Sequence, residues 1–223
     1  MELEQLLRRT LDLAEEGDWQ GASDLLREHV TTFDDEAAVH CWLGVAEREL
    51  GLEGIAYERF KRALALGPDD PYVLATAGSG IAAFDDPDAE LALRTAALMA
   101  PELPVARMLY GAFLSREGFL DDALRELDAA RALEPEDPQI AYELGVARYL
   151  AGRLDEATDA VGDAVALDPE DAWVRVVFGL LLCEAGRDEE GAGELAEGAR
   201  LAPEDVEGQA AAALAACAIG QDA

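Results

Sequence analysis

The chain has 223 residues; 51% are hydrophobic, 17 are Lys or Arg and 48 are Asp or Glu, so the formal net charge is −31. So large an acidic excess excludes a nucleic-acid backbone as the main partner and argues against an anionic membrane surface, because both need a basic footprint. Ala and Leu supply much of the apolar material and favour helix, so the composition predicts an all-α protein with a sizeable core.

The N-terminal segment, residues 1–18, is charged throughout and lacks the basic start and apolar centre of a signal peptide. No apolar run reaches the ~18 residues that a membrane-spanning helix needs. We therefore expect no membrane insertion and a cytoplasmic location. The cysteines, Cys41, Cys183 and Cys217, are too scattered for a disulfide framework and predict free thiols.

A period of 33 or 34 residues recurs in four series of residues, which share one phase. The series are Pro68, Pro101, Pro135, Pro169 and Pro203; Gly44, Gly78, Gly111, Gly145 and Gly179; Ala22, Ala56, Ala89, Ala123, Ala157 and Gly191; and Gly17, Gly51, Gly118, Gly152, Gly186 and Gly220, with Asp85 and Asp86 at the one gap.

Each series has a structural explanation. A glycine inside a helix costs about 1 kcal/mol against alanine, so the Gly44 series predicts sites where a second helix crosses too closely for a side chain. The Ala56 series would be the other side of that crossing. The Gly51 series falls where a first helix should end in a left-handed cap, and the prolines end the second helix.

The repeat therefore predicts successive helix pairs. In chain order these are 2–30, 36–66, 71–100, 104–133, 138–167 and 172–201, followed by a final helix at 205–219. As domains, we expect a single solenoid over 1–223 with units at approximately 2–34, 36–69, 70–102, 103–136, 137–170 and 171–204.

A large residue followed by glycine in the first helix, then an early alanine in the second helix and a closing proline, resembles the tetratricopeptide repeat (TPR) family. Here the pairs are Leu43–Gly44, Ala77–Gly78, Tyr110–Gly111, Leu144–Gly145 and Phe178–Gly179. The resemblance implies a right-handed superhelical solenoid of about six TPR-like units plus a C-terminal helix, with the first helices lining the concave face. The chain departs from the family where a tyrosine is usual and has Glu47, Ile81, Leu114, Arg148 and Leu182.

The sequence offers little for catalysis. His29 and His40 fall on different predicted helices, no two cysteines have CxxC spacing, and the phosphate-binding glycine motifs are absent. The acid pairs lie at the junctions between units, where helix capping explains them. We therefore expect no enzyme, no metal site and no cofactor.

The TPR register instead indicates a protein-binding concave face that is mostly apolar and aromatic. Its predicted residues are Cys41, Arg48, Tyr72, Met108, Arg116, Tyr142, Tyr149, Trp173 and Val176. The alternative is that such residues only pack against neighbouring repeats. For Val146 and Leu180 packing is favoured, and for Tyr142, Tyr149 and Trp173 binding is favoured.

These features predict a scaffold or adaptor that holds an apolar or amphipathic peptide or helix of a partner protein in its groove. The acidity either keeps the chain in solution or attracts basic partners. The alternative function is a self-assembling homo-oligomer joined through the Ala-rich C-terminal helix, which lacks the polar outer face of a terminal unit.

Overall fold

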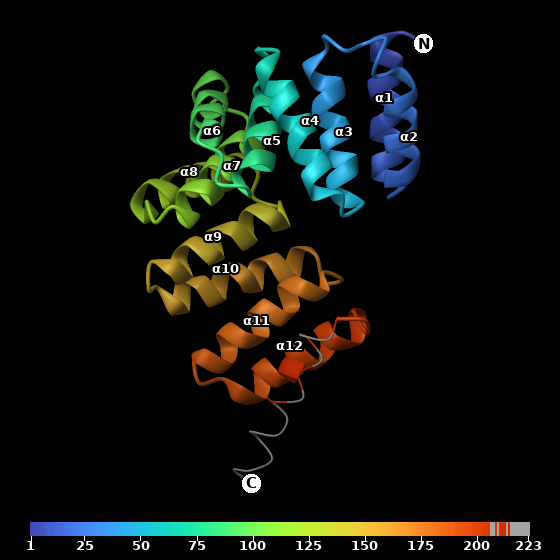
Figure 1. Ribbon diagram of the computed structural model, residues 1–223. Helices are drawn as coiled ribbons and strands as arrows, with labels where there is room; N and C mark the ends of the chain where they lie inside the picture. The colour runs from blue at the N-terminus through green and yellow to red at the C-terminus, as the bar shows by residue number, and fades with distance from the viewer. Residues whose placement is uncertain (206–207, 209, 213, 215–223) are drawn as a thin grey trace. The chain divides into compact units, whose positions relative to one another are not determined.

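In a computed structural model of the chain, the described residues are 1–205, 208, 210–212 and 214, and their regular structure is helical throughout (Figure 1). The helices are α1 (Leu3–Glu15), α2 (Trp19–His29), α3 (Ala37–Glu49), α4 (Glu53–Ala65), α5 (Pro71–Ala82), α6 (Asp88–Met99), α7 (Pro104–Arg116), α8 (Leu120–Leu133), α9 (Pro138–Leu150), α10 (Leu154–Leu167), α11 (Ala172–Glu184) and α12 (Asp188–Leu201).

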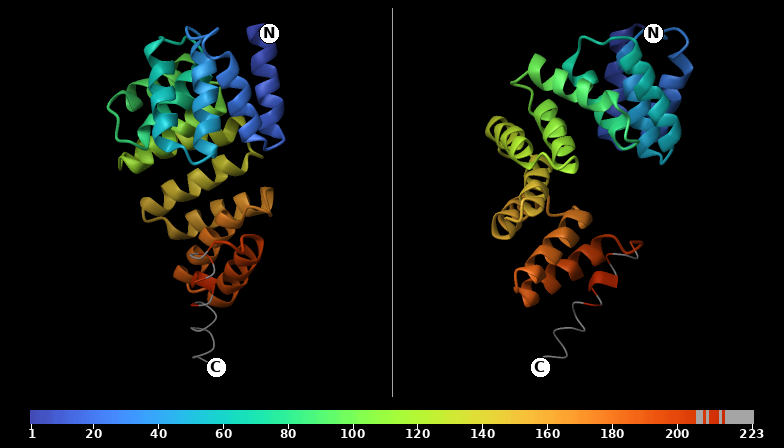
Figure 2. Two further views of the ribbon diagram at one scale, coloured as in Figure 1. Left: turned by 45° about the vertical axis from the view of Figure 1, so that its right-hand side comes forward. Right: turned by 60° about the vertical axis from the view of Figure 1, so that its left-hand side comes forward.

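The chain divides into two compact units, Met1–Phe113 and Leu114–Ala223, which we call unit 1 and unit 2. Within each unit, consecutive helices lie side by side as antiparallel pairs (Figures 1 and 2). The bounds of the twelve described helices confirm the predicted helix positions up to residue 201. A single solenoid over 1–223 stays a prediction, and most of the final helix expected at 205–219 lies outside the described residues.

The first helix of each pair ends in a residue with left-handed backbone, as the glycine period predicts. Positive φ angles occur at Gly17, Gly51, Gly118, Gly152 and Gly186. In the pair that lacks this glycine, Asp85 takes the conformation, with φ of 53°. Aspartate is one of the few side chains that tolerate this region, so the turn is kept without glycine.

Aspartate side chains cap several of the helices, again as expected. Asp70, Asp137 and Asp171 each accept a hydrogen bond from a backbone N–H of the first helical turn. Helix α6 begins without a side-chain cap on its N-cap residue. Pro87 is the N-cap there, while Asp86 accepts from the Asp88 N–H at 2.9 Å.

The glycine series does mark close helix crossings. A Cβ on Gly145 would lie 2.4 Å from the Val161 side chain and 3.2 Å from the carbonyl oxygen of Ala157. A Cβ on Gly179 would lie 2.8 Å from the carbonyl oxygen of Gly191. The second helix therefore meets the first at the Ala56-type residue, as predicted, and also one turn further on.

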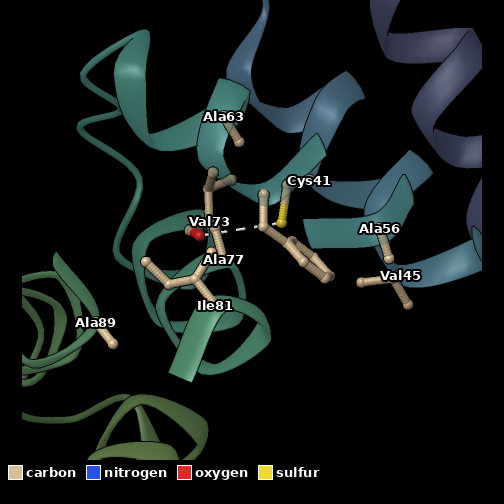
Figure 3. Packing of buried hydrophobic residues seen from close by; sticks show 9 residues of the cluster. Cys41, Val45, Ala56, Ala63, Val73, Ala77, Ile81 and Ala89 are labelled. Atoms are coloured by element: carbon tan, nitrogen blue, oxygen red, sulfur yellow. Dashed lines mark hydrogen bonds between the residues drawn. The ribbon is translucent and has the colours of Figure 1, made fainter. Parts of the chain in front are cut away.

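The core of unit 1 centres on Phe60 of α4, which is 1% exposed. Its ring contacts the backbone of Gly44 on α3 and of Gly80 on α5 so closely that a Cβ on either glycine would lie within 3 Å of it. Around it gather the small side chains drawn in Figure 3, where the thiol of Cys41 lies 3.9 Å from the Val73 carbonyl oxygen that accepts its hydrogen bond. One large ring thus fixes three helices against one another.

The core of unit 2 is aliphatic. Val161, Ala164 and Val165 of α10 pack against Ala141 of α9 and against Val174 and Leu181 of α11. One second helix therefore supports two first helices, and this arrangement sets the spacing between α9 and α11.

Candidate protein-binding face

The first helices α9 and α11 of unit 2 carry a row of apolar side chains that borders the α10 core, against which Tyr142 and Val177 pack. We call this surface the first-helix face of unit 2; it consists of Tyr142, Val146 and Tyr149 on α9 and Trp173, Val177 and Leu180 on α11. Trp173 is 55% exposed, Leu180 49% and Tyr149 43%. Helical spacing of three or four residues puts each row on one side of its helix.

A pocket of about 200 Å³ opens on this face between α9 and α11. Val146 and Tyr149 form one wall, Val177 and Leu180 form the other, and Val161 of α10 contributes from below. Glu184, one turn after Leu180, is the one charged residue in the lining. The pocket is therefore an apolar slot with a carboxylate beside it.

Two hydrogen bonds between side chains join α9 to α11 across the face. The indole N–H of Trp173 donates to the hydroxyl of Tyr142 at 3.2 Å. The hydroxyl of Tyr149 donates to Glu184 at 3.0 Å, and this bond raises the pKa of Tyr149. Burial raises the pKa of Tyr142. Both tyrosines therefore remain neutral near neutral pH, Tyr149 as a hydrogen-bond donor to Glu184 and Tyr142 as an acceptor from Trp173.

Three of the predicted groove residues lie inside the protein. Cys41 is 1% exposed, Val176 5% and Met108 8%. All three stand three positions before a glycine of the Gly44 series, where the side chain turns into the packed interior. They cannot contact a ligand directly, and the proposed surface omits them.

The remaining predicted residues lie at or near the surface. In unit 1, Tyr72 is 36% exposed and stacks on Trp42 with ring centroids 6.0 Å apart. Arg48 is half-buried; its guanidinium lies 5.9 Å from the centre of the Phe60 ring. Arg116 is exposed on α7. These residues do not join the α9–α11 pocket.

The repeat register favours packing for Leu180 and does not single out Val177 or Glu184. The register contained a signal for Leu180, since it directly follows a glycine of the Gly44 series, as Val146 does. Whether such a residue is exposed depends on the size of the side chains on the neighbouring helix, which the repeat pattern does not specify.

A separate furrow of about 330 Å³ lies in unit 1, between the second helices α4 and α6. Lys61, Leu64 and Leu91 help to line it. Lys61 is already paired there with Asp86 and Asp88, at 3.0 and 2.8 Å. The furrow therefore combines apolar walls with a lysine that is already paired with two carboxylates of the chain.

Residues 1–205 and the few described beyond them contain no cluster of three or more His, Cys, Asp or Glu side chains suited to a metal ion. Over the same residues, no helix combines the length and apolar character needed to cross a membrane. Cys41 and Cys183 are free thiols, while Cys217 and the oligomer contact expected of the C-terminal helix lie outside the described residues.

No protein-family model matches the chain, and comparison with curated protein sequences finds no match. Solved structures match it well. A chain of the APC/C hetero-tetramer Cut9–Hcn1 aligns with a TM-score of 0.79 and 14% identity, over 94% of this chain and 42% of that one. This chain therefore spans less than half of that neighbour.

PilW, a widely conserved type IV pilus biogenesis factor, aligns with a TM-score of 0.74 and 16% identity, over 93% of this chain and 96% of that one. YrrB, a TPR protein with an unusual peptide-binding site, aligns with a TM-score of 0.55 and 18% identity, over 82% and 90%. At these identities the likeness concerns the fold, which agrees with the glycine crossings and left-handed turns seen here. The chain is an all-α helical-repeat protein with the tetratricopeptide-repeat fold.

Proposed function

We propose that the chain is a protein-interaction scaffold that binds an apolar or amphipathic segment of a partner protein on the first-helix face of unit 2. The observation that carries this proposal is the exposure of Trp173, Leu180 and Tyr149 beside the α9–α11 pocket. Large apolar side chains grouped around a concavity are typical of interaction sites, whereas scattered ones are ordinary surface.

The face also suits binding energetically. Burying one large apolar side chain of a partner in the pocket would contribute about 1.5–3 kcal/mol. The rings of Tyr149 and Trp173 are held by their hydrogen bonds to Glu184 and Tyr142, so little side-chain freedom would be lost on binding. Rigid aromatic side chains around a pocket are the usual centre of a binding interface.

The comparisons support a protein partner by analogy alone. YrrB, which shares the fold, is a TPR protein with a peptide-binding site. Since one fold hosts many functions, the pocket and its aromatic border support a protein partner more strongly than the neighbour does.

A triple variant tests the proposal: Tyr149→Ala, Trp173→Ala and Leu180→Ala in the full chain. The matched control removes three exposed apolar residues of unit 2 that lie off this face, with Phe119→Ala, Leu133→Ala and Leu167→Ala. Both proteins and the wild type are used as bait in the source organism's lysate, and the captured proteins are quantified by mass spectrometry. Circular dichroism checks that all three remain folded.

We expect at least one protein to be captured by the wild type and the control and to be depleted by about tenfold or more with the triple variant, because each anchor contributes on the order of 1 kcal/mol or more. Capture that is equal for the folded triple variant and the wild type would refute the assignment of this face.

A further inference from the structure

Glu184 occupies a distinct position on the first-helix face of unit 2. It is exposed, it lines the α9–α11 pocket, and the hydroxyl of Tyr149 donates to it at 3.0 Å. Leu180 precedes it by one helical turn and Val177 by two. A long side chain of a bound partner that lay along α11 would therefore contact the apolar Val177 and Leu180 first and the carboxylate of Glu184 at its end.

Apart from Arg116 of α7, which does not line the α9–α11 pocket, the arginines of unit 2 pair with carboxylates other than Glu184. The pairs are Arg125–Asp122, Arg131–Asp163, Arg148–Asp128, Arg153–Glu156, Arg175–Glu194, Arg187–Glu190 and Arg200–Glu197. Among the described residues, Glu184 takes part in no ion pair. Its carboxylate therefore remains available to a cation from outside the chain.

The shape of the pocket matches a particular kind of side chain. Lysine and arginine have an aliphatic stem that packs on apolar surface and a charged head that stays at the polar edge. Here the stem would lie between Val146 and Leu180, and the head would reach Glu184. The Tyr149 hydroxyl holds that carboxylate in place, and the net charge of −31 attracts a basic segment.

We propose that the α9–α11 pocket selects a lysine or arginine side chain from a basic partner segment, with its stem against Val177 and Leu180 and its head paired with Glu184. This inference rests on the proposed function, since it assumes that the face binds a peptide segment. It adds the chemical class of the anchor, for which an uncharged leucine or phenylalanine is the competing occupant.

The test uses a library of random 12-residue peptides displayed on phage and selected against the full-length chain. Parallel selections use Leu180→Ala, which removes an apolar wall, and Glu184→Gln, which removes the charge. The control is Glu189→Gln, an exposed acid of α12 outside the pocket lining. The strongest peptide is then synthesised with its basic residue and with norleucine at that position, and both affinities are measured.

We expect peptides that need Leu180 and carry a basic residue at one fixed position. Replacing that residue with norleucine should weaken binding roughly five- to tenfold on the wild type and on Glu189→Gln, but less than about twofold on Glu184→Gln, because the pair is then already broken. Such a coupling supports the inference.

Two other outcomes overturn it in distinguishable ways. Peptides that depend on Leu180 but show no basic preference, or an equal norleucine effect on all variants, reject the cationic anchor and leave the proposed function standing. If no selected peptide is weakened by Leu180→Ala, the proposed function fails and the inference fails with it.

Discussion

Glu47 is a fully buried carboxylate in the interior of unit 1, at a position where a tyrosine would be usual for this repeat. Arg27 of α2 donates to one of its oxygens at 2.9 Å, and Arg59 of α4 lies 3.4 Å from the other. Burying a charge is costly unless it is paired and hydrogen-bonded. The two guanidinium groups meet that requirement and connect three helices.

We predict that Glu47→Ala lowers the free energy of unfolding by about 3–5 kcal/mol, because it leaves two partly buried guanidinium groups without their shared partner. Glu49→Ala is the control, since Glu49 is exposed and pairs with Arg48 at 3.4 Å. It should cost less than about 1 kcal/mol. Urea unfolding measures both, and similar losses for the two variants would contradict the role given to Glu47.

Cys41 provides a prediction about pH. Burial raises the pKa of its thiol to about 12, with a smaller opposing effect from Arg48. The reactive thiolate is therefore scarce at pH 7 to 9 in the folded protein. Burial also raises the pKa of the half-buried Cys183, so iodoacetamide at pH 8 should label Cys183 slowly and leave Cys41 unmodified until denaturant is added, as read by peptide mass spectrometry. Rapid labelling of Cys41 in the folded chain would mean that the interior of unit 1 is accessible.

For single residues, the sequence predicts the position in the helical repeat better than it predicts how far the side chain is exposed. Cys41, Met108, Tyr142 and Val176 all stand three positions before a repeat glycine, and a common concave role was expected for them. The structure buries three of them and leaves Tyr142 half-buried. Exposure depends on the neighbouring side chains, such as Val73 opposite Cys41, and a repeat pattern does not contain that information.

Among the elements, the crossing of α11 and α12 gives the sharpest test of the repeat. Gly179 faces the backbone of α12, and a Cβ there would lie 2.7 Å from the Leu195 side chain and 2.8 Å from the Gly191 carbonyl oxygen. Gly193 lies inside α12, and a Cβ built on it would have no heavy atom within 4 Å. The two glycines therefore differ in packing while sharing a helical backbone.

We predict that Gly179→Ala destabilises the chain by about 1–3 kcal/mol through overpacking, since backbone atoms cannot move aside cheaply. Gly193→Ala should stabilise it by up to about 1 kcal/mol, because alanine is the better helix former and nothing obstructs it. Thermal unfolding followed by circular dichroism measures both signs. Two shifts in the same direction would mean that Gly179 does not mark a close helix contact.

The helix pairs could be predicted because small residues and turns recur in one phase over the whole chain. The 34-residue period does not predict a contact between helices that occurs only once in the chain. Gly80 belongs to no series, yet a Cβ on it would lie 2.2 Å from the Phe60 ring. Such a pairing arises from the size of one side chain, so it is visible only after the helices are packed.

Over the whole molecule, the net charge of −31 has a consequence for stability. Like charges repel in the compact state more than in the extended chain, and salt reduces the screening length from about 30 Å at 0.01 M to about 3 Å at 1 M. We predict that the melting temperature rises with NaCl over this range, and that KCl has a similar effect. A fall in melting temperature with salt would show that the ion pairs outweigh the net repulsion.

The all-helical class and the scaffold hypothesis both came from the sequence, since composition excludes some partners and the repeat specifies the fold. The sequence predicts only part of the proposed binding face. Val177 and Glu184 contribute to the pocket only because α10 holds α9 and α11 at the observed spacing. The tertiary packing of three helices, and not a motif, creates the slot.

The most direct test of the account is to map a bound peptide on the full-length chain by NMR. The probe is the strongest 12-residue peptide from the wild-type selection, titrated into isotope-labelled protein. We predict that the largest shift changes fall on Val146, Tyr149, Val177 and Leu180, around the α9–α11 pocket. Changes centred instead on the α4–α6 furrow at Leu64 and Leu91, with α9 and α11 unaffected, would contradict the central claim.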